Sequence, residues 1–243
     1  MSPDIKTGYM ETMQASAKIF LDYENGVTED TRFRRKQVFT SAQLPLENRQ
    51  PFGNLHTWNE EVLAAGASSR YHAEKDTTDV FIPVVGSLLF CNGRESTPVA
   101  PGELLCVSSA ESSNWSVSSP YTEAGTLISF LHIGFRDSVN RSQNRLLGFE
   151  VAATGIANVL DLGSASFSIT RMKGRQVTSH RLADTSGGLF VYALQGAFEV
   201  EGRLLHPGDG LALWNLTEAE AEALSEEAIV IFLDLPRISN PSV

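Results

Sequence analysis

The sequence is poor in cysteine and in basic charge. Its 243 residues include only two cysteines, Cys91 and Cys106, and both lie in apolar runs, so we expect buried free thiols rather than a disulfide framework. The formal net charge of -10 argues against attraction to phosphate groups, which requires clustered lysine and arginine. We therefore expect no direct binding to nucleic acid.

Long apolar runs are absent as well. No segment approaches the roughly 20 apolar residues that a membrane-spanning helix needs. The first residues, 1–20, lack the basic and then apolar order of a secretory signal. We expect a cytoplasmic protein that does not associate with membranes. The sequence also has no phosphate-cradling glycine loop, no GxSxG elbow and no CxxC pair, which disfavours nucleotide-dependent and nucleophilic catalysis.

Short apolar or alternating runs, separated by Gly, Pro, Ser and Asn, dominate the chain from about residue 50 onward. This pattern is typical of an all-β fold with many turns. Two series of runs are alike, because each has a long apolar run broken by one glycine and then Pro-Gly followed by an acidic residue. The first series contains VFIPVVGSLLF and APGELL, and the second contains FVYALQGAFEV and HPGDGLAL. The repeat predicts two duplicated β-barrel domains.

The repeat also suggests where the domains divide. We predict an N-terminal extension that packs on the barrels (1–49), a first barrel (50–143), an interdomain connection (144–160) and a second barrel with a C-terminal tail (161–243). Whether the extension covers a barrel end or supports a homodimer stays open.

Two charged segments favour solvated structure. The basic cluster RFRRK (32–36) predicts a surface loop or a partner-facing patch. The Glu- and Ala-rich segment TEAEAEALSEEA (217–228) predicts a short helical or loop insertion. The acidic residues after Pro-Gly, Glu103 and Asp209, are expected to accept hydrogen bonds from backbone amides in their turns.

Four segments carry a resemblance to a known family: FGNLHTWNEEVLAAG, HAEKDTTDVFIPVVGSL, GLALWN and IVIFLDLP, in that order. In this order they resemble the pirin and quercetin 2,3-dioxygenase-like bicupins, over about 52–236. The resemblance implies an all-β fold with two tandem cupin barrels, each a double-stranded β-helix or jelly roll, in one chain.

The resemblance also implies a metal site in the first barrel. In the family, one non-haem transition metal ion (Fe, Cu, Ni or Mn) is held by a His-x-His pair and, one hairpin later, by a His-x-Glu pair. His72 matches the first histidine, but the second is replaced by Glu74, and the later pair falls on Trp115 and Val117, which cannot bind a metal. His72 and Glu74, two residues apart on a predicted strand, share a face. A degraded metal site is therefore expected.

Two hypotheses about function follow. In the first, the protein is non-catalytic, holds no metal and binds a small molecule or a protein partner. In the second, it is a metal-dependent dioxygenase of the quercetin 2,3-dioxygenase type, in which His56 and His132 join His72 and Glu74 in a rearranged site, with Glu74 as ligand or base. In the second barrel, His180 and His206 offer no complete ligand set.

Tryptophans are the candidates for lining a ligand pocket. Trp58 and Trp115 both lie in the first barrel, and Trp115 stands at the position of a family metal ligand, where its indole would fill the space of the ion.

Overall fold

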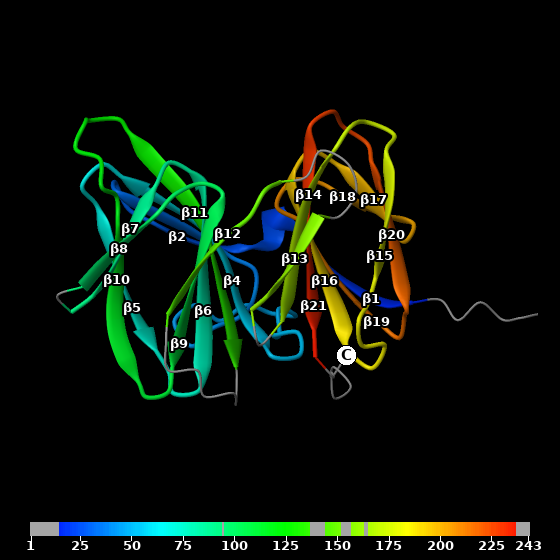
Figure 1. The fold of residues 1–243 in the computed structure, drawn as a ribbon, viewed down its shortest axis with the longest axis horizontal. Coiled ribbons are helices and arrows are strands. Elements are labelled where there is room, and N and C mark those ends of the chain that lie inside the picture. The colour runs from blue at the N-terminus through cyan, green and yellow to red at the C-terminus, as the bar shows by residue number, and fades with distance from the viewer. Residues whose placement is uncertain (1–14, 94, 137–143, 152–156, 163–164, 237–243) are drawn as a thin grey trace, which may run out of the picture.

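The computed structural model describes residues 15–93, 95–136, 144–151, 157–162 and 165–236. It shows two β-barrels side by side, as Figure 1 illustrates, and confirms the predicted all-β fold. Within these ranges the only helix is the 3-10 turn η1 (Asp22–Glu24), and no helix is long enough to cross a membrane.

The first barrel consists of a seven-stranded and a four-stranded antiparallel sheet. Its strands are β2 (Gly26–Glu29), β3 (Phe33–Gln37), β4 (Leu55–Ala64), β5 (Ser68–Ala73), β6 (Thr77–Val85), β7 (Leu88–Asn92), β8 (Glu95–Val99), β9 (Glu103–Ser109), β10 (Ser113–Ser118), β11 (Leu127–Arg136) and β12 (Arg145–Gly148). The larger sheet has the order β12-β9-β6-β11-β4-β3-β2, and the smaller has the order β5-β10-β7-β8.

The second barrel has a six-stranded and a four-stranded antiparallel sheet. Its strands are β1 (Ser16–Phe20), β13 (Ala157–Asp161), β14 (Ser166–Met172), β15 (Val177–Arg181), β16 (Gly188–Gln195), β17 (Phe198–Val200), β18 (Arg203–Leu205), β19 (Gly210–Trp214), β20 (Glu218–Ala223) and β21 (Ala228–Leu235). The orders are β1-β19-β16-β21-β14-β13 and β15-β20-β17-β18.

The two barrels share one topology. Strands β4 to β11 occupy the same places in their sheets as β14 to β21, so the repeat seen in the sequence is a structural duplication. The two repeated glycines, Gly86 and Gly196, occupy equivalent turns between β6 and β7 and between β16 and β17. Both have a positive φ (70° and 74°), a backbone conformation that glycine adopts without steric cost.

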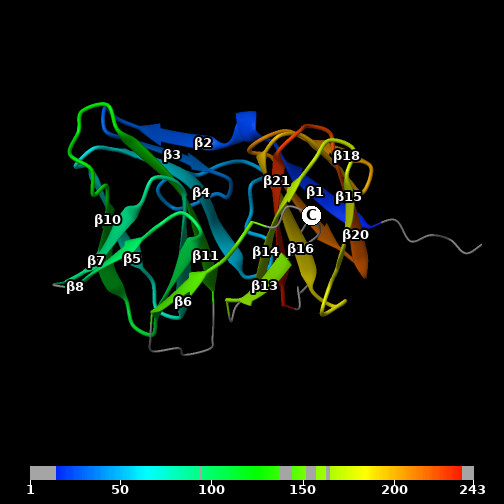
Figure 2. The same cartoon turned by 45° about the horizontal axis from the view of Figure 1, so that its top comes forward.

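The edge strands tie the barrels together. β1 pairs with β19 of the second barrel, although β2 and β3, which follow it directly, extend the sheet of the first. Figure 2 shows this blue segment passing from one barrel to the other. β12, from the segment that we assigned to the interdomain connection, pairs with β9 of the first barrel. The N-terminal segment thus supplies strands to both barrels.

The prediction of a helix or loop over 217–228 is wrong. Residues 218–223 form β20, in which glutamates alternate with the fully buried Ala219, Ala221 and Ala223. A spacing of two matches the pleat of a strand, so burial of one face overrides the low strand propensity of Glu and Ala. The prediction for the Pro-Gly turns is confirmed, because Glu103 accepts from the Ala100 amide and Asp209 from the His206 amide, both at 2.8 Å.

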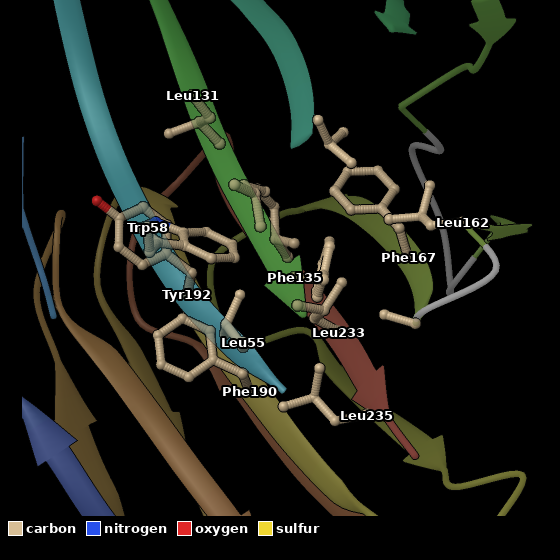
Figure 3. Close-up of a cluster of buried hydrophobic side chains, with 14 of the residues drawn as sticks. Leu55, Trp58, Leu131, Phe135, Leu162, Phe167, Phe190, Tyr192, Leu233 and Leu235 are labelled. Atoms are coloured by element: carbon tan, nitrogen blue, oxygen red, sulfur yellow. The ribbon is translucent and has the colours of Figure 1, made fainter. Parts of the chain in front are cut away.

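A shared apolar core joins the barrels. Figure 3 shows it between β4 and β11 of the first barrel and β16 and β21 of the second. Trp58 lies at its centre, fully buried, with ring centroids 4.9 Å from Phe190 and 4.7 Å from Tyr192. Trp58, named above as a candidate for lining a pocket, therefore packs in the interface between the barrels. Tyr192 also donates a hydrogen bond of 2.6 Å to Glu60 Oε1 across the interface.

In the part of the chain that the structure describes, neither Cys91 nor Cys106 forms a disulfide, as expected. Cys106 is buried, whereas Cys91 on β7 is only half-buried.

Candidate functional site

Polar side chains gather on the inner face of the first barrel's larger sheet. They come from four neighbouring strands, β3, β4, β11 and β6. Arg35 is the register partner of Glu61, His132 is the partner of both Asn59 and Phe81, and Gly134 faces Asp79. Because side chains directly opposite each other in a sheet share a face, these residues form one polar row inside the barrel.

Glu61 is the centre of this row and is fully buried. Its carboxylate accepts hydrogen bonds from Arg35 Nε (3.0 Å), Arg35 Nη2 (3.3 Å) and the Tyr71 hydroxyl (2.5 Å). Burial alone would raise the pKa of Glu61, but the hydrogen bonds and charges of His132 and Arg35 outweigh it and lower that pKa. Glu61 is therefore ionised at neutral pH.

Burial and the nearby charge of Glu61 raise the pKa of Tyr71 well above its usual value, which keeps the phenol a donor. Arg35 belongs to the basic cluster that we expected at the solvated surface. The structure instead turns its guanidinium into the barrel, within 5.4 Å of the Tyr71 ring centroid.

His132 bridges two carboxylates. Its Nε2 lies 2.8 Å from Asp79 Oδ1 and its Nδ1 lies 3.5 Å from Glu61 Oε1. The imidazole stacks on Phe81 with 4.8 Å between ring centroids. Burial would lower the pKa of His132, but the hydrogen bonds and charges of Asp79 and Glu61 outweigh it and raise that pKa. The surroundings of His132 therefore favour the protonated imidazolium form more than water does.

A cavity of ≈ 360 Å³ opens onto this polar row. Its walls come from β3 and the segment after it, from β4 and β5, and from single residues of β6, β10 and β11; they are Arg35, Gln37, Phe39, Ser41, Gln43, His56, Thr57, Asn59, Arg70, Tyr71, His72, Asp79, Trp115 and His132. Trp115 stacks on Tyr71 with 4.4 Å between ring centroids and an interplanar angle of 20°. The two rings are therefore buried against each other at the inner side of the wall.

A β-bulge brings His56 into the cavity wall. Leu55 pairs with Phe135 and Thr57 with Gly134, so His56 is an extra residue in β4. Bulges re-aim side chains and are frequent beside functional sites. Burial lowers the pKa of His56, and the opposing attraction of Asp79 does not restore it, so the imidazole is neutral.

Several buried polar atoms around the cavity have no hydrogen-bond partner within the described ranges. They are His56 Nε2, Asn59 Oδ1 and Trp115 Nε1, whereas His132 Nδ1 has its contact of 3.5 Å to Glu61. Buried polar groups in folded proteins are nearly always paired. The three atoms have almost no accessible surface of their own, although their residues line the cavity.

The proposed metal ligands, His72 on β5 and Glu74 just after its end, lie elsewhere. Tyr71 and Ala73 point into the barrel, so His72 and Glu74 lie on the exposed, outer side. His72 reaches the rim of the cavity, where its Nδ1 lies 3.0 Å from Asn114 Oδ1, and Glu74 takes no part in the wall. His56 and His132 do line the cavity. In the part of the chain that the structure describes, no three His, Cys, Asp or Glu side chains are grouped so as to hold a metal ion.

The second barrel has fewer charged side chains at the equivalent positions. The paired registers match Glu61 to Thr170, Asp79 to Leu189 and Trp115 to Ala219. The position of Tyr71 is taken by His180, which lies 2.7 Å from Asp234 Oδ1 and stacks on Phe232. Fully buried aliphatic and aromatic side chains fill this barrel. The polar row and its cavity are features of the first barrel.

Comparisons with known proteins match both the second barrel and the whole fold. Residues 163–235 match the family model of the quercetinase C-terminal cupin domain. YhhW from Escherichia coli shares 18% identity at a TM-score of 0.80, over 93% of this chain and 100% of its own. A second structure of it, described as bacterial pirin YhhW in complex with nickel(II), has 17% identity and a TM-score of 0.78 over 92% of this chain and 100% of its own.

A quercetin 2,3-dioxygenase from Acinetobacter baumannii is similar at 11% identity and a TM-score of 0.68, over 90% of this chain and 86% of its own. A search of curated proteins finds no match. At these identities the structural likeness establishes the fold. The second barrel thus matches the quercetinase C-terminal cupin domain, and the chain as a whole has a two-barrel fold similar to that of bacterial pirin.

Proposed function

We propose that the first barrel binds a small polar organic molecule in its cavity, without a metal ion and without catalysing a reaction. The polar lining of this cavity carries the proposal, because side chains such as Gln43, Thr57 and Arg70 line it and are not fully buried. A few polar groups in a concave site fix the orientation of a bound ligand. The cavity volume of ≈ 360 Å³ falls in the range of small-molecule sites.

The side chains that face the cavity do not fit a metal ion. Both inward carboxylates, Glu61 and Asp79, are already paired with the cationic side chains of Arg35 and His132. A metal needs a neutral imidazole as ligand, whereas the surroundings of His132 favour its protonated form. A divalent ion here would also meet the repulsion of two cations. The charges of Glu61 and Asp79 are thus balanced by Arg35 and His132, and no metal ion is needed to balance them.

The alternative is a metal-dependent dioxygenase built around His72 and Glu74. The quercetinase-type second barrel favours it, as does the similarity in fold to a quercetin 2,3-dioxygenase. It requires β5 to slip by one residue, because only then would His72 and Glu74 face inward and Tyr71 outward. Such a slip would break the stacking of Tyr71 on Trp115 and the hydrogen bond from Tyr71 to Glu61.

Elemental analysis separates the two functions. The purified protein is supplemented with iron, copper, nickel and manganese, desalted and analysed beside His72→Ala. We expect no near-stoichiometric transition metal in either protein. A metal present in wild type and lost from His72→Ala would overturn the metal-free proposal and call for oxygen-consumption assays with flavonols.

Ligand binding is tested by a thermal-shift screen of small polar metabolites. Trp115→Phe keeps a ring beside Tyr71 but removes part of the cavity wall, so we expect it to weaken a hit about fivefold, the equivalent of about 1 kcal/mol of lost contact. Trp214→Phe, in the second barrel, is the matched control and should leave the affinity unchanged. If no compound stabilises the protein, or if both variants weaken a hit equally, the cavity is not the binding site.

A further inference from the structure

One edge of β5 is not paired with any strand that the structure describes. β5 stands at the end of the smaller sheet of the first barrel, in the order β5-β10-β7-β8. The hydrogen bond of 3.0 Å from the Ser119 N–H to the Ala67 carbonyl fixes the alternation of bonds between β5 and β10. Every second residue, including Tyr71, therefore bonds to β10, whereas the N–H and C=O groups of Arg70 and His72 point to the free edge.

This free edge lines the cavity. Arg70 and His72 both belong to the cavity wall, although their side chains lie on the outer side of the strand. The Arg70 side chain runs to a groove of ≈ 470 Å³, beside its successive register partners Ser116 and Cys91. The His72 ring turns toward β10, where its Nδ1 lies 3.0 Å from Asn114 Oδ1. The main chain of β5 is therefore the part of this strand that faces the cavity.

The other walls carry polar side chains. The segment after β3 contributes Ser41 and Gln43, β4 contributes Thr57, and none of the three is fully buried. A ligand between these hydroxyl and amide groups and the main chain of β5 has donors and acceptors on both sides.

The spacing on β5 indicates what kind of ligand fits. The N–H and C=O groups of Arg70 and His72 are two residues apart, which is roughly 7 Å along a strand. Within the described ranges no protein group hydrogen-bonds to them. Pairs of donors and acceptors at this interval match the main chain of an extended peptide, which binds exposed sheet edges by adding a strand.

We infer that the ligand is a short peptide in extended conformation, which adds to the free edge of β5 as a further strand. This inference rests on the proposed binding function and names the class of ligand. Two residues of the peptide pair with Arg70 and His72, and the residue between them lies beside Tyr71 and directs its side chain into the cavity. Pairing with both positions takes about three peptide residues, a length that suits a cavity of ≈ 360 Å³.

Proline at position 70 separates the role of the main chain from that of the side chain. Arg70→Pro removes the N–H that faces the cavity, and no bond to β10 is lost because this N–H lies on the free edge. Arg70→Ala removes the guanidinium and keeps the N–H. The probe is acetyl-Ala-Ser-Ala-amide, which has no terminal charges, and its binding is measured by isothermal titration calorimetry. We expect Arg70→Ala to bind it as wild type does and Arg70→Pro to bind it about tenfold more weakly.

Ser179→Pro is the matched control. The hydrogen bond from the Leu182 N–H to the Thr217 carbonyl gives β15 the same alternation, so the Ser179 N–H lies on the free edge of β15. β15 is the strand of the second barrel that is equivalent to β5. Ser179→Pro should leave the affinity for the peptide unchanged. Circular dichroism checks that both proline variants keep their β-structure.

N-methylated peptides test the same pairing on the unchanged protein. Only alternate N–H groups of an added strand face its neighbour. Methylation of the serine nitrogen and methylation of the following alanine nitrogen should therefore differ in their effect on affinity by about tenfold. This measurement decides the question even if Arg70→Pro does not fold.

Several results would overturn the inference. They are binding of the probe by Arg70→Pro at wild-type affinity, an equal loss in Ser179→Pro, a loss in Arg70→Ala, and equal effects of the two methylations. A peptide of this size reaches roughly millimolar affinity, so the absence of binding at about 10 mM also excludes the peptide class. A hit from the metabolite screen that Arg70→Pro does not weaken would leave the binding function in place with a ligand of another class.

Discussion

Replacing Glu61 by glutamine tests whether the buried charges hold the first barrel together. The variant keeps the shape of the side chain and one carbonyl oxygen for Arg35 and Tyr71, but it removes the negative charge that balances Arg35 and His132. Two cations then face Asp79 alone. The variant should therefore be less stable than wild type.

The size of the effect follows from burial. Removing one partner of a fully buried ion pair costs about 3–5 kcal/mol. The Arg35 side chain is 26% exposed, so water screens part of its charge, and we expect a loss of about 2–3 kcal/mol. For a chain of this length that lowers Tm by roughly 5–10 °C.

The dependence on pH gives the effect a signature. The pKa of Glu61 is lowered in the fold, so its stabilisation is present above the unfolded value of 4.5 and is lost as pH falls through the folded pKa. The pKa of His132 is raised, so its stabilisation is present below 6.5 and is lost as pH rises through the folded pKa. In Glu61→Gln the acid-side loss from Glu61 disappears. The alkaline-side loss is smaller and is complete at lower pH, because the folded-state pKa of His132 is raised less once one of its two carboxylates is gone.

Thermal denaturation followed by circular dichroism across the acid to alkaline range measures both features. Glu199→Gln is the control, because Glu199 is exposed on β17 and its loss should move Tm by only about 1 °C. If Glu61→Gln melts within about 1 °C of wild type at neutral pH, the buried network contributes no net stability and the reasoning is refuted.

Two further variants probe the interface and the cavity wall. Tyr192→Phe deletes the hydrogen bond to Glu60 between the barrels. It should lower the free energy of unfolding by about 1.5–3 kcal/mol, as measured by urea titration. An unchanged midpoint would mean that water solvates Glu60 as well as the Tyr192 hydroxyl does. Gln37→Leu removes the amide that donates to Phe39 O, Ser41 Oγ and Leu44 O, so backbone amides over 38–46 should exchange hydrogen about tenfold faster in mass spectrometry. Exchange at the wild-type rate would show that other contacts hold this segment.

The architecture could be predicted from the sequence because the same set of strands occurs twice. Apolar runs that break at Gly86 and Gly196 predict two similar barrels, and the strand orders confirm this. The partners of β1 could not be predicted, because strand pairing between residues nearly 200 positions apart leaves no local pattern. The strand of 218–223 was missed because its local composition favours a helix, whereas its alternation of Glu and Ala has period two.

The site was harder to predict than the fold. On β5 the resemblance drew attention to His72, but a one-residue difference in register decides which face points inward, and Tyr71 is the residue that enters the barrel. Arg35 was placed at the surface because a run of basic residues usually is. Its partner Glu61 lies 26 positions away, and only the pairing of β3 with β4 brings the two together. A buried ion pair has no signature in either segment alone.

The pairing of β1 with β19 also bears on the order in which the chain folds. β1 is synthesised before β2 to β18, yet its partner strand is among the last to be made, since Ser16 pairs with Trp214. Until then β1 has no strand to pair with, and its edge stays open to other chains. Closing such a long loop is intrinsically slow. We therefore expect the first barrel to form early during synthesis and the joining of β1 to the second barrel to be the late, rate-limiting step.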